Sequence, residues 1–64
     1  MTFINLNGTD YRADMISRVT GIYQRENTHN FTITCDGKDY TFCEHRLSTV
    51  EELREHLFTE LNKL

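Results

Sequence analysis

Cys43 and His45 are the first residues that could do chemistry, because they lie two positions apart on a predicted strand and so share one of its faces. A thiol and an imidazole at this spacing could bind one metal ion, or act as a nucleophile and its base. A zinc site needs a second pair of ligands, and Cys35 is expected on the opposite face. Catalysis also needs an orienting group and an oxyanion site, which the pattern does not supply. The sequence therefore predicts no metal, no cofactor and no enzyme activity.

His56 is the second candidate, because it lies four residues after Glu52 and four before Glu60 on a predicted helix. Side chains at this spacing are neighbours on a helix, and both carboxylates would favour the charged imidazole. We interpret this group as a solvated helix face. A mildly pH-dependent surface is the alternative.

Composition limits the classes of protein that the chain can represent. It has 64 residues, 38% of them hydrophobic, with ten acidic and seven basic residues and a net charge of −3. This length predicts one small domain over residues 1–64. No run approaches the about 20 apolar residues of a membrane span, and clustered Lys and Arg for direct nucleic-acid binding are missing. The first residues also lack the pattern of a signal peptide, so we expect a cytoplasmic protein with reduced cysteines.

Two dipeptides, Asn7-Gly8 and Asp36-Gly37, predict β-hairpins with two-residue turns, because these residue types tolerate positive φ. The expected cross-strand pairs are Leu6/Thr9, Ile4/Tyr11 and Phe3/Arg12 in the first hairpin, and Ile33/Tyr40, Phe31/Phe42 and Thr32/Thr41 in the second. The second register places Cys35 on an apolar face and Cys43 on a threonine-rich face. We therefore expect no disulfide between the two cysteines.

The segment from Asp14 to Glu26 has apolar spacing that fits a strand or a helix. Its β-branched residues and Gly21 favour a strand with a bulge at the glycine. The polar stretch Glu26–Asn30 is then expected to be a loop.

The C-terminal segment carries the pattern of an amphipathic helix. Ser48 and Glu51 match a capping box, Glu51 and Glu52 would lie in the first turn, and Lys63 in the last. An apolar stripe follows at three- and four-residue steps: Val50, Leu53, Leu57, Leu61 and Leu64. The predicted fold class is α+β, an antiparallel β-meander of four to five strands with one C-terminal α-helix packed on one face.

The order of these elements resembles the small FlbD-type proteins of some flagellar operons, and also short β-rich phage and prophage proteins. The shared frame consists of Ile4 to Gly8, Ile16 to Val19, Phe31 to Ile33, Asp36-Gly37 and Val50 to Leu53. The resemblance implies the same fold and no catalytic residue. The chain departs from the FlbD pattern in its longer middle loop and its cysteines.

One helix can cover only one face of the sheet, so the other face and two edges are expected to be open. We expect a partner-binding surface formed by Phe3, Arg12, Thr32, Thr34, Thr41, Cys43, Glu52 and Glu55. The predicted function is a small non-catalytic protein-interaction module, which binds itself as a homodimer or, if phage-encoded, modulates a host or defence protein. The alternative is an acidic inhibitor that mimics nucleic acid and blocks the basic groove of a nucleic-acid-binding enzyme.

Overall fold

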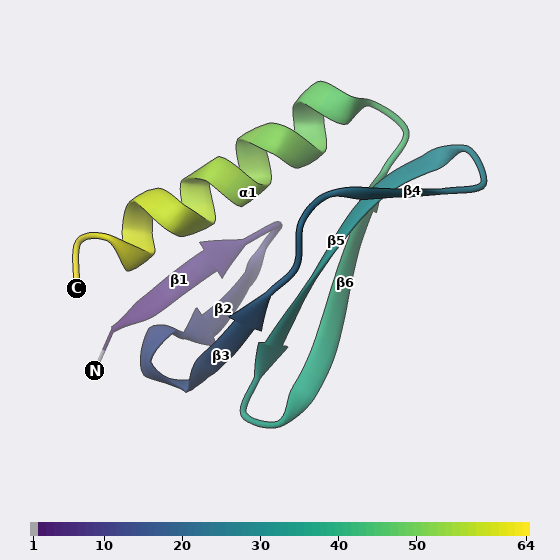
Figure 1. Ribbon diagram of the computed structural model, residues 1–64. Coiled ribbons are helices and arrows are strands. Elements are labelled where there is room, and N and C mark those ends of the chain that lie inside the picture. The colour runs from purple at the N-terminus through teal and green to yellow at the C-terminus, as the bar shows by residue number, and fades with distance from the viewer. Residues whose placement is uncertain (1) are drawn as a thin grey trace.

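The computed structural model describes residues 2–64, which form antiparallel strands and one C-terminal helix (Figure 1). The elements are β1 (Phe3–Leu6), β2 (Thr9–Arg12), a 3-10 turn η1 (Ala13–Met15), β3 (Ile16–Val19), β4 (Tyr23–Arg25), β5 (Thr28–Cys35), β6 (Lys38–Glu44) and α1 (Leu47–Leu61). The predicted α+β class is confirmed. Among the described residues, no helix has the length and apolar character needed to cross a membrane.

Both predicted hairpins form with the expected registers. Strand β1 pairs with β2, and β5 pairs with β6, through all six of the expected cross-strand pairs. The turn residues take positive φ, at 55° and 92° for Asn7 and Gly8 and at 54° and 77° for Asp36 and Gly37. Such angles are typical of the turn type whose twist matches the flanking strands.

The segment between the hairpins is mostly extended, but the prediction of one strand bulged at Gly21 is wrong. Asp14 and Met15 lie in η1, and two short strands, β3 and β4, follow with a break between them at Gly21. Strands β3 and β4 pair with successive parts of β5, and the register shifts between Ile16 and Arg18. The chain leaves the ladder around Gly21, but Thr20 still holds it to β5. The Thr20 amide donates to the carbonyl of Thr32 over 2.9 Å, and the Thr20 hydroxyl accepts from the Thr32 amide over 2.9 Å.

The expected loop over Glu26–Asn30 is wrong. Only Glu26 and Asn27 form a turn, with Glu26 at a φ of 56°, and β5 begins at Thr28. The polar side chains of this segment form hydrogen bonds with nearby main-chain groups. The Thr28 hydroxyl donates to the Arg25 carbonyl over 2.9 Å, and the buried Asn30 amide donates to the Thr28 carbonyl over 3.2 Å. These local bonds allow a polar sequence to enter the strand.

The predicted capping box is wrong. Helix α1 starts at Leu47, its N-cap Arg46 makes no side-chain cap bond, and no acidic residue lies in the first turn. Two residues join β6 to the helix, and the Val50 amide already donates to the Arg46 carbonyl over 3.4 Å. Lys63 lies beyond the helix end, where its ammonium binds Glu60 at 2.8 Å. Leu64 is 65% exposed and leaves the apolar stripe.

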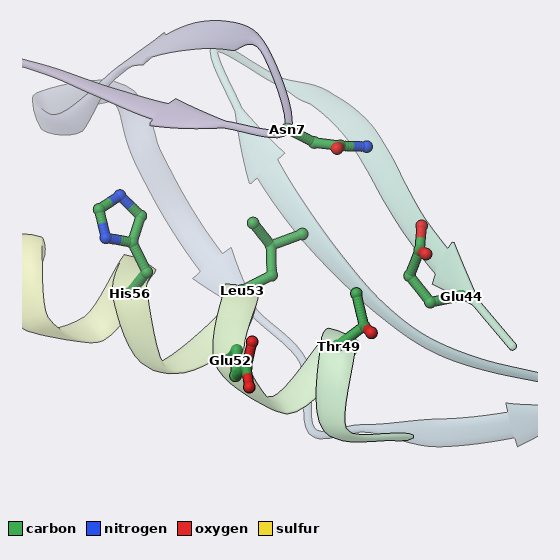
Figure 2. A pocket seen from close by; sticks show the side chains of 6 residues that line it. All are labelled: Asn7, Glu44, Thr49, Glu52, Leu53 and His56. Atoms are coloured by element: carbon green, nitrogen blue, oxygen red, sulfur yellow. The ribbon is translucent and has the colours of Figure 1, made fainter. Parts of the chain in front are cut away.

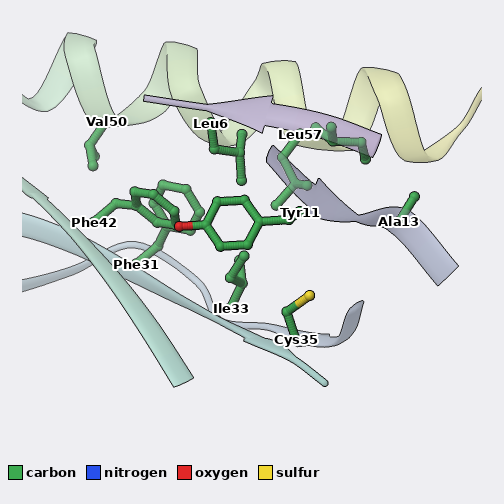
Figure 3. Close-up of a cluster of buried hydrophobic side chains, with 10 residues drawn as sticks. Leu6, Tyr11, Ala13, Phe31, Ile33, Cys35, Phe42, Val50 and Leu57 are labelled. Atoms are coloured by element: carbon green, nitrogen blue, oxygen red, sulfur yellow. The ribbon is translucent and has the colours of Figure 1, made fainter. Parts of the chain in front are cut away.

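The β1–β2 hairpin forms its own two-stranded sheet, whereas one continuous meander was expected. Figure 1 shows this hairpin beneath α1, with the larger sheet beside it. The core between these parts contains packed aromatic rings (Figure 3). The Tyr11 ring meets the Phe42 ring edge-on, with centroids 6.0 Å apart, and the Phe31 ring stacks on the Phe42 ring, with centroids 5.2 Å apart. The buried apolar residues are Ile4, Leu6, Tyr11, Ala13, Phe31, Ile33, Cys35, Phe42, Val50 and Leu57.

Candidate protein-interaction surface

A groove of about 220 Å³ lies between β2, η1 and the end of the β5–β6 hairpin. Three of its side chains are large, apolar and exposed: Phe3 at 53%, Met15 at 36% and Tyr40 at 36%. The core residues Tyr11 and Cys35 line it as well. We call this surface, defined by Phe3, Met15, Tyr40, Tyr11 and Cys35, the aromatic groove.

Neighbouring elements hold the walls of the aromatic groove in place. The Tyr40 ring meets the Tyr11 ring edge-on, with centroids 5.1 Å apart and planes at 68°. The Met15 carbonyl accepts from the Asp36 amide over 3.0 Å, which fixes η1 against the β5–β6 turn. The Cys35 thiol donates to the Arg12 carbonyl over 3.7 Å. The groove is therefore supported by contacts between elements that are separate in the sequence.

The border of the groove is acidic. The Arg12 guanidinium binds the Asp14 carboxylate through two bonds of 2.9 and 3.3 Å, and this holds the pKa of Asp14 below its usual value. Arg12 is thereby neutralised locally. Asp10 and Asp36 also line or border the groove, and Asp10 accepts a 2.9 Å bond from the uncharged Asn5 amide. An apolar centre with an acidic border suits a partner that is apolar and basic.

Tyr11 remains protonated well above neutral pH. Burial, and then the neighbouring Tyr40, raise the pKa of its phenol above the usual value of 10.0. Tyr11 therefore contributes no tyrosinate charge to the groove at physiological pH.

The outer face of the four-stranded sheet is polar and internally hydrogen-bonded. The Thr32 hydroxyl shares bonds with the Tyr23 phenol at 3.1 Å and with the Thr41 hydroxyl at 2.9 Å. The Thr34 hydroxyl donates to Asp39 over 2.6 Å. Cys43 is exposed on this face and Cys35 is buried on the other, with both thiols free, so their predicted separation is confirmed. Mutually satisfied hydroxyl groups suit a solvated face.

The glutamates of α1 lie on two separate surfaces. Glu52 lines a cleft of about 310 Å³ together with Asn7, Glu44, Thr49, Leu53 and His56 (Figure 2). Glu55 lines a different cleft with Ile22, Glu51, Arg54 and Phe58. The neighbouring carboxylate Glu60 has its pKa lowered mainly by its hydrogen bond and ion pair with Lys63, with a smaller effect from His56.

The structure divides the predicted binding residues into three groups. Phe3 and Arg12 line the aromatic groove, the residues Thr32, Thr34, Thr41 and Cys43 share the outer sheet face, and Glu52 and Glu55 lie on α1. The expectation that Phe3 and Arg12 extend the threonine face is wrong, because β1 and β2 form a separate sheet. The sequence interpretation missed Met15 and Tyr40. The position of Tyr40, close to the turn, was a signal that its ring lies at the end of the sheet.

The Cys43 and His45 pair does not share a strand. Strand β6 ends at Glu44, and His45 is exposed just beyond it. Across residues 2–64, no three His, Cys, Asp or Glu side chains are grouped so that they could hold a metal ion.

Comparisons of the chain with family models, with curated proteins and with solved structures found no match.

Proposed function

We propose that this chain is a small non-catalytic protein-interaction module that binds a partner protein through the aromatic groove. One observation carries the proposal: Phe3, Met15 and Tyr40 gather in one groove although each is at least 36% exposed. Exposed apolar side chains that cluster inside a polar border are typical of protein-binding sites. Scattered single exposures would carry no such meaning.

The acidic border restricts the chemistry of the partner. The charge of Arg12 is neutralised by its ion pair with Asp14. The carboxylates of Asp10 and Asp36 therefore give the border of the groove a net negative charge. The fitting partner is a cytoplasmic protein that presents an apolar side chain beside Lys or Arg. If the chain is phage-encoded, that partner is a host or defence protein.

Capture from an extract of the native cells tests the groove when matched variants are used. The chain, Phe3→Ser, Met15→Ser and the control Leu47→Ser are immobilised in parallel, since Leu47 is exposed on α1 and does not line the groove. We expect one protein to be retained by the chain and the control, and lost from both groove variants. Titration of that purified protein should show binding weakened at least about tenfold by Phe3→Ser. Equal binding to all four proteins would contradict the proposal.

A second candidate function is inhibition of a nucleic-acid-binding enzyme by an acidic surface. The observation that favours it is that Glu51, Glu52 and Glu55 are exposed on α1, whereas Arg54 of the same helix is engaged with the Thr20 carbonyl. Such binding would depend on charge alone, so it would weaken steeply with salt. Loss of the captured protein with Glu52→Gln and Glu55→Gln, but not with Phe3→Ser, would support this second function.

A further inference from the structure

Strand β6 is an open edge of the four-stranded sheet. Within residues 2–64 it pairs with β5 alone, through seven successive pairs from Lys38 to Glu44 (Figure 1). The opposite edge is different, because β3 and β4 have four and three residues, a register shift and a break around Gly21. Bulges and short strands are devices that protect edges from pairing. Only the β6 edge of this sheet lacks them among the described residues.

The turn geometry tells which main-chain groups face the open edge. Cys35 and Lys38 are paired on either side of the two-residue turn, and in hairpins with such turns the flanking residues direct their main-chain groups at each other. Lys38 and every second residue after it, up to Glu44, therefore direct their main-chain groups toward β5. Asp39, Thr41 and Cys43 direct theirs outward, where an added strand can bind them.

We propose that a second copy of this chain pairs with β6, antiparallel and about a two-fold axis through Thr41. In this register Thr41 lies opposite Thr41 of the partner subunit, and both direct their main-chain groups to the shared edge. Lys38 lies opposite Glu44 of the partner subunit, and Tyr40 lies opposite Phe42 of the partner subunit. The strand thus pairs opposite charges and two aromatic rings with itself.

The side-chain pairs select this register. Lys38/Glu44 and Tyr40/Phe42 fall at positions that do not share main-chain bonds, where facing side chains come closest. Opposite charges and aromatic pairs across strands stabilise a sheet, and the two-fold axis makes each pair occur twice. A shift of two residues would place Lys38 opposite Phe42, or leave Lys38 without a facing residue in the strand. Both shifted registers lose the charge pairs.

This inference adds a second copy as partner to the proposed protein-binding function. The β6 edge shares Tyr40 with the aromatic groove, but the two surfaces can be tested by variants at different residues. The variants that test the aromatic groove change Phe3 and Met15, which lie outside β6. If the parent chain is monomeric, and Phe3→Ser no longer captures the partner protein, the inference is overturned and the proposed function still stands.

Charge exchange across the two-fold axis tests the register. Light scattering measures the mass of the chain, of Lys38→Glu, of Glu44→Lys and of the double variant, over a series from micromolar to submillimolar concentration. Arg25→Glu is the matched control, because Arg25 lies on β4 at the opposite edge. Circular dichroism verifies that each variant is folded.

We expect the chain and Arg25→Glu to form dimers, and each single β6 variant to dimerise at least about tenfold more weakly because like charges then face each other. An equimolar mixture of the two single variants should regain the dimer, since every facing pair again joins opposite charges. The double variant should regain it for the same reason. A monomeric mass at all concentrations, equal dimerisation of all variants, or a mixture no stronger than its components would overturn the inference.

Discussion

The Nε atom of Arg54 donates to the carbonyl oxygen of Thr20 over 3.0 Å, and its guanidinium lies 4.7 Å from the ring centroid of Phe58. Thr20 lies at the break between β3 and β4, where the strand ladder is interrupted. This contact therefore ties α1 to the part of the sheet where the ladder is interrupted. Arg54 is a structural residue, although it lies among exposed glutamates.

Replacement of Arg54 should lower stability. Arg54→Ala removes both the bond to Thr20 and the contact with Phe58, so the free energy of unfolding should fall by about 1–2 kcal/mol. Arg46→Ala is the control, because Arg46 is exposed and should change stability by less than about 0.5 kcal/mol. Urea unfolding measures both variants. Equal stability of the two would contradict a structural role for Arg54.

Leu57 should be essential for folding. It is fully buried at the centre of the core, and a buried leucine replaced by alanine costs about 2–5 kcal/mol. A domain of this size has roughly 3–5 kcal/mol of stability in total, so Leu57→Ala should lose most of it and melt at a much lower temperature than the parent chain. Thermal melting followed by circular dichroism should show this, whereas Leu64→Ala should melt like the parent chain. A cooperative melt of Leu57→Ala close to that of the parent would contradict the core assignment.

The fold could be predicted where local signals agree with packing. Asn7-Gly8 and Asp36-Gly37 fixed both hairpin registers, because their turn type allows only one pairing. The start of α1 and the entry into β5 could not be predicted in this way. Leu47 begins the helix because the link from β6 is short, and Thr28 joins β5 through side-chain bonds that depend on Asn30. Neither follows from the spacing of the apolar residues or from the turn residues.

Acid should destabilise the chain through its ion pairs. Arg12 lowers the pKa of Asp14 in the folded state, so this contribution to stability is present above the unfolded value of about 3.9 and is lost as pH falls through the folded value. The pair of Glu60 with Lys63 acts in the same direction. Melting temperatures measured from pH 6 to about pH 2 should fall less steeply for Asp14→Asn than for the parent. Glu51→Gln, which removes a carboxylate that makes no ion pair within residues 2–64, should follow the parent curve.

The two thiols should react at very different rates. Cys43 is exposed and Cys35 is buried, and neither is bridged. A thiol reagent should modify one cysteine in the folded chain and the second only after denaturation. Cys43→Ser should leave the folded protein almost unreactive, and Cys35→Ser should not. Fast modification of Cys35 in the folded state would contradict its burial.

The candidate site could be predicted only in part. Phe3 and Arg12 were identified because they face away from Ile4 and Tyr11 in the hairpin. Their neighbours in the aromatic groove come from other elements, and the sequence does not reveal how the β1–β2 sheet packs against β6. The hairpin register places Tyr40 opposite Ile33, yet only its contact with Tyr11 shows that it forms a wall of the groove.

Hydrogen–deuterium exchange with the captured partner tests the central claim most directly, because it locates the binding surface on this chain. We predict that the partner slows exchange in residues 9–15 and 36–40, which carry Tyr11, Met15 and Tyr40 of the aromatic groove. The same partner should leave the exposed side of α1 around Glu52 and Glu55 unchanged. Protection confined to residues 51–56, with none in the groove segments, would contradict the account and would favour the acidic inhibitor instead.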